Sequence, residues 1–90
     1  MDPSKLASIV GHVFDAAGRP VADATVMIET SDRPHHDIAL LTDARGEFRF
    51  VDLLPGNYTI AARTPDGARS RATMQLAAGQ VARVRLASGA

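Results

Sequence analysis

The sequence predicts an all-β protein, an antiparallel sandwich of seven short strands. Apolar residues recur at every second position along seven segments, the spacing of side chains that share one face of a strand. Residues typical of turns separate these segments at short intervals. No segment combines a 3.6-residue apolar period with helix caps, so helix should be nearly absent.

The first three predicted strands cover residues 8–14, 24–30 and 37–42. The first strand places Ile9, Gly11 and Val13 on one side and Val10, His12 and Phe14 on the other, and both sides are fairly apolar. The second places Ala24, Val26 and Ile28 on one face, and the third places Ile38, Leu40 and Thr42 together. Between the first two strands, Asp15 and Gly18 take the first and last positions of a turn, and Pro20 prevents the strand from continuing. Residues 31–36 form a polar loop before the third strand.

The fourth and fifth strands follow two strong turn signals. Asp43-Ala44-Arg45-Gly46 repeats the Asp-x-x-Gly spacing and predicts a type I turn. Phe48 and Phe50 then share one face, which we expect in the core. In Leu54-Pro55-Gly56-Asn57, proline fixes φ near about −65° and glycine accepts a positive φ, as a type II turn requires. Tyr58 and Ile60 line the inner face of the next strand.

We expect the last two strands to pair as a hairpin. Pro65-Asp66-Gly67 is a turn that opens it, and residues 68–76 and 80–87 would pair across a turn at residues 77–79. In that register two apolar rows match, namely Ala72, Met74 and Leu76 beside Ala82, Val84 and Leu86. The opposite face would carry Arg71, Arg83 and Arg85, near Thr73 and Gln75.

These motifs together resemble the carboxypeptidase regulatory-like domain, a transthyretin-like (prealbumin-like) β-sandwich. The residues that carry the resemblance are Gly11, Asp15, Gly18, Pro20, Thr42, Asp43, Gly46, Phe48, Phe50, Leu53, Pro55, Gly56 and Tyr58. It implies Greek-key connections, sheets of three and four strands, and an accessory module appended to other proteins. We expect the domain at residues 8–87, after a flexible leader at 1–7 and before a tail at 88–90.

Composition limits the protein further. Ninety residues with 46% hydrophobic content predict one domain. The absence of cysteine excludes disulfides, a thiolate nucleophile and a cysteine zinc site. No apolar run is long enough to span a membrane as a helix, and residues 1–6 lack the apolar segment of a secretory signal. The chain is therefore either cytoplasmic or a piece of a larger cell-envelope or secreted protein, and its compartment stays open.

The formal charge is zero but unevenly distributed. Residues 1–60 carry five basic and nine acidic side chains, a net charge of −4, whereas residues 61–90 carry five arginines and Asp66, a net charge of +4. The two halves could neutralise each other in the folded sandwich. Alternatively Arg71, Arg83 and Arg85 form a patch that docks an anionic partner. Without interleaved aromatics or a recognition helix, nucleic-acid binding is not expected.

Candidates for chemistry are few. His12 lies mid-strand between Val10 and Phe14, where a packed or half-exposed histidine is expected. His35 and His36, with Asp37, form the best metal-like cluster, but adjacent residues on an extended chain point to opposite sides, and a third ligand such as Asp32 would be needed. We therefore expect no catalytic residue, no metal site and no cofactor.

The resemblance does not imply an enzyme. Metallocarboxypeptidases that carry a similar domain keep their zinc ligands in a separate catalytic domain. The hydroxyisourate hydrolase is similar in fold, but its C-terminal Tyr-Arg-Gly-Ser is missing, since this chain ends Leu86-Ala87-Ser88-Gly89-Ala90.

The sequence thus favours a non-catalytic accessory module for structural support or protein docking, with a neighbouring domain or protein as partner. Homo-oligomers through edge strands stay open. A carbohydrate-binding or other ligand-binding module that uses loop 31–36 is the alternative, although three of its four Phe and Tyr residues occupy expected core positions. A small hydrolase that uses the histidines ranks third.

Overall fold

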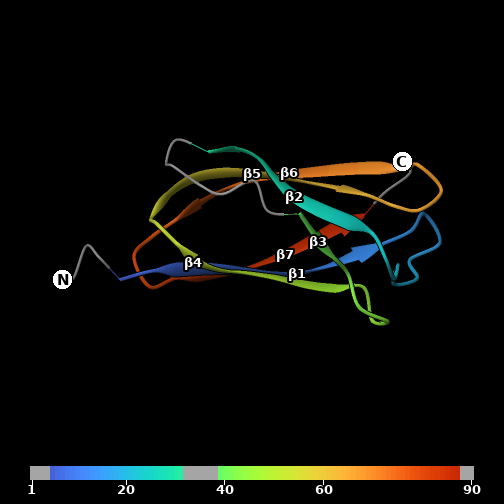
Figure 1. Cartoon of the computed structure of the whole chain (residues 1–90), viewed down its shortest axis with the longest axis horizontal. Coiled ribbons are helices and arrows are strands. Elements are labelled where there is room, and N and C mark those ends of the chain that lie inside the picture. Colours follow the sequence, from blue (N-terminus) through green and yellow to red (C-terminus); the bar gives the residue numbers. More distant parts are fainter. Residues whose placement is uncertain (1–4, 32–38, 88–90) are drawn as a thin grey trace.

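The computed structural model describes residues 5–31 and 39–87, and every regular element in these two segments is a strand (Figure 1). The strands are β1 (Ala7–Phe14), β2 (Thr25–Ser31), β3 (Ala39–Leu41), β4 (Glu47–Leu53), β5 (Gly56–Arg63), β6 (Arg69–Leu76) and β7 (Val81–Ala87). They form a three-stranded sheet in the order β4-β1-β7 and a four-stranded sheet in the order β3-β2-β5-β6. The predicted seven-stranded sandwich with sheets of three and four strands is confirmed. No helix able to cross a membrane occurs in these segments.

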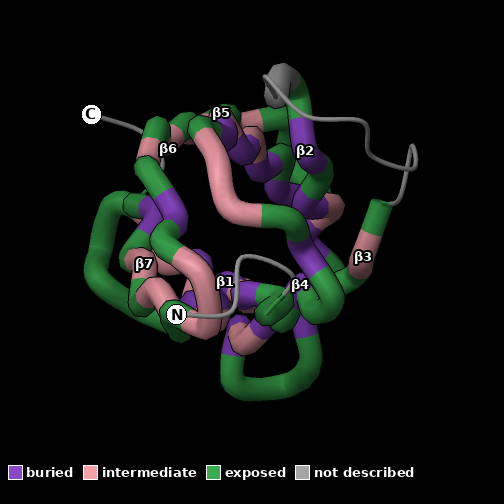
Figure 2. The backbone as a smooth tube through the Cα atoms, turned by 90° about the vertical axis from the view of Figure 1, so that its left-hand side faces the viewer, coloured by how far each residue is buried: buried purple, intermediate pink, exposed green. Residues whose placement is uncertain are grey.

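The core lies between the two sheets, as alternation predicted. Most of its side chains come from alternate residues of the strands, and Ala24 directly precedes β2. The core residues are Ala7, Ile9, Val13, Ala24, Val26, Ile28, Phe48, Phe50, Leu53, Tyr58, Ile60, Ala62, Leu76 and Leu86. Phe48 and Phe50 are each 3% exposed, and Tyr58 is 1% exposed. Figure 2 shows that β6 and β7 lie at the same side of the sandwich, where intermediate and exposed residues dominate. On these two edge strands only Leu76 and Leu86 are fully buried, and the other inward residues are partly buried against the core.

The predicted hairpin of the last two strands is wrong. The strand β6 pairs with β5, from Gly56 opposite Leu76 to Arg63 opposite Arg69, whereas β7 lies beside β1 in the other sheet. The turn at Pro65-Asp66-Gly67 joins β5 to β6 instead. The two apolar rows therefore lie on inner faces of opposite sheets and not side by side in one sheet.

The physical reason is the path of residues 77–80. The backbone N–H of Gly79 donates to the Lys5 carbonyl (3.2 Å), and the N–H of Ser8 donates to the Gln80 carbonyl (2.9 Å). These bonds carry the chain from one sheet to the other at the end where β1 begins. Consequently β7 starts beside Ser8 and runs parallel to β1, the one parallel pair among the described strands.

The third strand ends one residue earlier than expected. It covers Ala39–Leu41, whereas the prediction was 37–42. Residues 37 and 38, together with most of the predicted loop at 31–36, lie outside the described residues. Thr42 follows the strand and is buried.

Both Asp-x-x-Gly turns form as predicted. Asp15 Oδ1 accepts the backbone N–H groups of Ala17 and Arg19, each at 2.9 Å. Asp43 does the same for the two residues at equivalent positions. Gly46 has φ of +74°, and a Cβ there would lie 2.7 Å from the Val13 carbonyl oxygen, so the turn requires glycine. The turns after β1, β3 and β5 gather at the end of the sandwich opposite the start of β1 (Figure 1).

Candidate functional site

The residues of the sequence motif stabilise turns and the core. Thr42 is the first example. Its hydroxyl donates to the Val21 carbonyl (2.6 Å) and accepts from the Ala24 N–H (2.9 Å), while its own backbone bonds to Asp23 and Ala24. Thr42 is 3% exposed, so these partners replace water for groups inside the protein. Through these hydrogen bonds Thr42 holds the connection before β2 against the end of β3.

Gly11 and Tyr58 are likewise used by the fold. A Cβ on Gly11 would lie 2.6 Å from Phe48 Cζ and 2.6 Å from the Val84 carbonyl oxygen, so the bare backbone makes room for the phenyl ring. The buried Tyr58 donates its hydroxyl to the Leu54 carbonyl at 2.6 Å. That bond spans the turn between β4 and β5 and satisfies the polar end of a core side chain.

The outer face of the three-stranded sheet, called here the three-strand face, combines arginines with exposed apolar side chains. In its registers Arg49 and Arg83 flank Val10 on either side. One step toward the start of β1, Ser8 has Val81 as its neighbour on β7. Val81 is 57% exposed and Val51, which follows Arg49 on β4, is 55% exposed. The face therefore offers both apolar contact area and positive charge.

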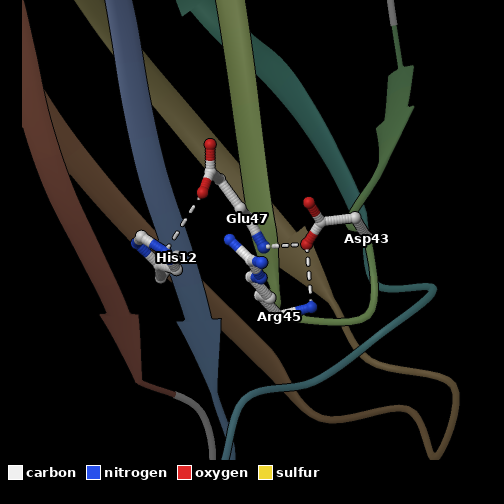
Figure 3. Close-up of polar contacts among 4 residues, drawn as sticks. All are labelled: His12, Asp43, Arg45 and Glu47. Atoms are coloured by element: carbon white, nitrogen blue, oxygen red, sulfur yellow. Dashed lines mark hydrogen bonds and ion pairs between the residues drawn. The ribbon is translucent and has the colours of Figure 1, made fainter.

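His12 sits in the middle of this face (Figure 3). Its Nε2 lies 3.5 Å from Glu47 Oε2, and its ring stacks on Phe14 with centroids 6.0 Å apart. The Arg85 guanidinium lies 4.2 Å above the Phe14 ring centroid, a cation–π contact. The histidine side chain is 43% exposed, the half-exposed environment that the sequence predicted. These contacts hold the imidazole as part of a packed surface layer.

The neighbouring Asp43 is an anion fixed by its turn (Figure 3). Its Oδ1 accepts the N–H groups of Glu47 (3.0 Å) and Arg45 (2.8 Å). These two donors lower the pKa of Asp43 below its usual 3.8, Glu47 most, with smaller contributions from the charges of Arg45 and His12. The carboxylate thus belongs to the turn, where its two backbone donors hold it.

The outer face of the four-stranded sheet carries an open groove of about 610 Å³. Its lining residues are Thr25, Met27, Glu29, Ala61, Ala62, Arg63, Arg69, Ser70 and Arg71. Arg63 stands directly opposite Arg69 on the neighbouring strand. Arg71 Nη2 forms an ion pair with Glu29 Oε1 at 2.6 Å. The sequence interpretation missed this groove, although a hairpin folded about Pro65-Asp66-Gly67 would have brought Arg63 and Arg69 together.

The predicted docking patch is divided by the fold. Arg83 and Arg85 lie on β7 and belong to the three-strand face, whereas Arg71 lies on β6 in the other sheet. Arg71, Arg83 and Arg85 cannot form one face, because the hairpin that would have joined them does not exist. A docking role for Arg83 and Arg85 stays a prediction.

The weak metal-site candidates of the sequence are not placed by the structure. His35 and His36, with Asp32 and Asp37, lie outside the described residues. Among the residues that are described, no group of three or more His, Asp or Glu side chains is arranged to hold a metal ion.

This chain matches one protein family over most of its length and one known transporter over a shorter stretch. The family described as "carboxypeptidase regulatory-like domain" matches residues 8–88. The TonB-dependent transporter Oar of Myxococcus xanthus is 38% identical over 53 residues, which cover 59% of this chain and 5% of the transporter.

Two solved structures are similar in fold. A DUF3823 family protein from Parabacteroides merdae superposes with a TM-score of 0.70 at 16% identity, over 94% of this chain and 46% of that one. The dioxygenase domain of a dioxygenase carbohydrate-binding protein fusion from Streptomyces sp. SirexAA-E gives a TM-score of 0.67 at 13% identity, over 94% and 80%. At such identities the likeness shows the fold alone.

Proposed function

The chain belongs to the carboxypeptidase regulatory-like domain family, and on this premise we propose that it is a non-catalytic accessory module that docks a neighbouring domain or a protein partner. The three-strand face would be its docking surface. The module would lend support or contact to a larger, exported protein, whose activity resides elsewhere in that protein.

The observation that carries the proposal is the composition of the three-strand face. Protein interfaces combine apolar area with arginine, and hot spots favour arginine and aromatic residues. Here Val51 and Val81 are more than half exposed, and Arg49 and Arg83 flank Val10 without an acidic side chain within ion-pair distance in the described segments. Phe14 and Arg85 extend this surface toward the end of β1.

Two further observations support a module without chemistry of its own. The motif residues have structural roles: Thr42 and Tyr58 form hydrogen bonds to backbone carbonyls, and Gly11 makes room for the Phe48 ring. The matching relative shares only 5% of its length with this chain, the proportion expected when a small domain accompanies a large host. In such an arrangement the host would perform the transport that its name describes.

A carbohydrate-binding module has less support. Sugar rings stack on exposed aromatic faces, but Phe48, Phe50 and Tyr58 are buried. Phe14 has the Arg85 guanidinium over its ring. The Streptomyces structure that shares the fold is the dioxygenase domain of its fusion, so the likeness carries no sugar site to this chain.

Site-specific photo-crosslinking in the natural host tests the docking proposal. A benzoylphenylalanine at position 81, replacing the exposed Val81, should yield a defined crosslinked product, and Arg83→Glu with Arg85→Glu should abolish it. The same probe at Gln75, on the other sheet, is the control and should not give that product. Equal crosslinking from position 75, or a product that survives the charge reversal, would refute the three-strand face as the docking surface.

A further inference from the structure

We propose that the groove on the four-stranded sheet binds an extended acidic peptide segment of a protein partner. This site is separate from the three-strand face and goes beyond the docking function proposed for it. The inference stands on three features of the groove: arginines without an acidic partner among the described residues, an apolar floor and an open shape.

The arginines of the groove favour binding of an anion. Arg63 and Arg69 are directly opposite each other on adjacent antiparallel strands, and like charges in that position destabilise a sheet. Glu29, the acidic residue of the groove, already pairs with Arg71. Within the described segments neither Arg63 nor Arg69 has an acidic partner, so the groove carries three arginines against one carboxylate.

A carboxylate fits this arrangement. A guanidinium offers paired N–H donors that match the two oxygens of a carboxylate, and two guanidinium groups can hold one such group between them. Binding would replace repulsion between Arg63 and Arg69 with two charge-assisted contacts. The existing pair of Arg71 with Glu29 shows the same chemistry on the same surface, with an N···O distance of 2.6 Å.

The floor and the shape point to a peptide. Met27 is 41% exposed and lies beside Ala61 in the register of β2 and β5. Methionine adapts to varied apolar side chains, so a leucine or phenylalanine next to the carboxylate would find contact there. The groove is open and crosses the three strands β2, β5 and β6, which suits an extended segment that lies over the sheet.

Methyl NMR can locate binding because the methionines are few. Met27 lies in the groove, and Met74 lies on β6 with its side chain packed against the core. With ¹³C-methyl methionine in the 90-residue chain, an acetylated peptide that alternates aspartate with leucine should shift the Met27 signal saturably. The Met74 signal should stay in place. A peptide with lysine instead of aspartate should leave both signals unchanged.

Two charge-matched variants decide whether the groove is responsible. Arg63→Glu with Arg69→Glu should weaken peptide binding at least about tenfold, and higher salt should weaken it in the parent chain. Arg83→Glu with Arg85→Glu changes the net charge equally on the other sheet and should alter affinity less than about twofold. Arg63→Gln with Arg69→Gln serves if the glutamate variant does not fold by circular dichroism.

Three results would overturn the proposal. The first is an unmoved Met27 signal at about millimolar aspartate peptide. The second is an equal loss of affinity in both charge-reversed variants, since binding would then follow net charge alone. The third is saturation of the Met27 shift by inorganic phosphate or a short oligonucleotide at lower concentration than by the peptide, which would make the groove a phosphate site.

Discussion

Thr42→Val should destabilise the protein far more than its small change in volume suggests. The substitution keeps the shape of the side chain but removes the hydroxyl that donates to the Val21 carbonyl and accepts the Ala24 N–H. Ala24 is fully buried and Thr42 is 3% exposed, so water cannot readily replace the lost partner. Two polar backbone groups would be left without their hydrogen bonds.

The magnitude follows from these two groups. Leaving a buried donor or acceptor unsatisfied costs about 1–3 kcal/mol each, and the added methyl recovers up to about 0.8 kcal/mol of transfer free energy. The net loss in the free energy of unfolding should therefore lie between about 1 and 5 kcal/mol. For a domain of this size, 1 kcal/mol shifts Tm by about 4–8 °C, so a mid-range loss of about 3 kcal/mol should lower Tm by roughly 12–24 °C.

The matched control is Thr73→Val. The Thr73 hydroxyl also takes part in a hydrogen bond, with Thr59 at 3.0 Å, but on the exposed outer face of the sheet, where water can replace the partner. Thermal melting followed by circular dichroism should show a Tm within about 4 °C of the parent for this control. If Thr42→Val melts like the parent, or if both variants lose the same stability, burial is not what makes Thr42 important.

Three other substitutions test the core, the packing and a turn. Phe50→Ala should cost about 3–5 kcal/mol by denaturant titration, and an unshifted midpoint would exclude Phe50 from the core. Gly11→Ala should cost about 1–3 kcal/mol, because its Cβ would lie 2.6 Å from Phe48 Cζ; wild-type stability would show that the ring can yield. The pKa of Asp43 lies below 3.8, mainly through the Glu47 N–H, so the turn stabilises the fold above about pH 4 and this contribution is lost as pH falls through the folded pKa. Asp43→Asn should therefore lose less stability than the parent between about pH 4 and pH 2, and equal losses would contradict the assignment.

Local patterns predicted the strands and the core because each acts over a few residues. Alternation assigned Phe48, Phe50 and Tyr58 to inner faces, and all three are buried. The Asp-x-x-Gly spacing predicted the turns at Asp15 and Asp43, since the carboxylate and the glycine satisfy backbone needs within five residues. Such signals do not depend on what the rest of the chain does.

Strand partners were harder to predict, because alternation says which face is apolar but not which strand lies beside it. Met74 and Val84 point inward whether β6 and β7 share a sheet or face each other from opposite sheets. The deciding bonds are long-range: Gly79 to Lys5 and Ser8 to Gln80. Nothing local to residues 77–80 specifies those acceptors, so the hairpin, and with it a single patch of three arginines, was a reasonable but wrong expectation.

The unequal charge of residues 1–60 and 61–90 reflects the different structural positions of their charged residues. Among the described acids of the first sixty residues, Asp15 and Asp43 accept backbone N–H groups in turns, and Asp23 and Asp52 adopt a positive φ. The turn carboxylates thus stabilise the local backbone.

The arginines of the last thirty residues instead occupy outward positions of strands, and this leaves them available. The expectation that the two halves neutralise each other holds for Arg71 with Glu29. It does not extend to Arg63, Arg69 or Arg83, which have no ion pair within the described segments. Because β6 and β7 are edges of different sheets, the excess positive charge is shared between two outer faces. One chain can thereby present two separate cationic surfaces, each with its own apolar contact area, and the paired charge reversals on β7 and in the groove should act independently.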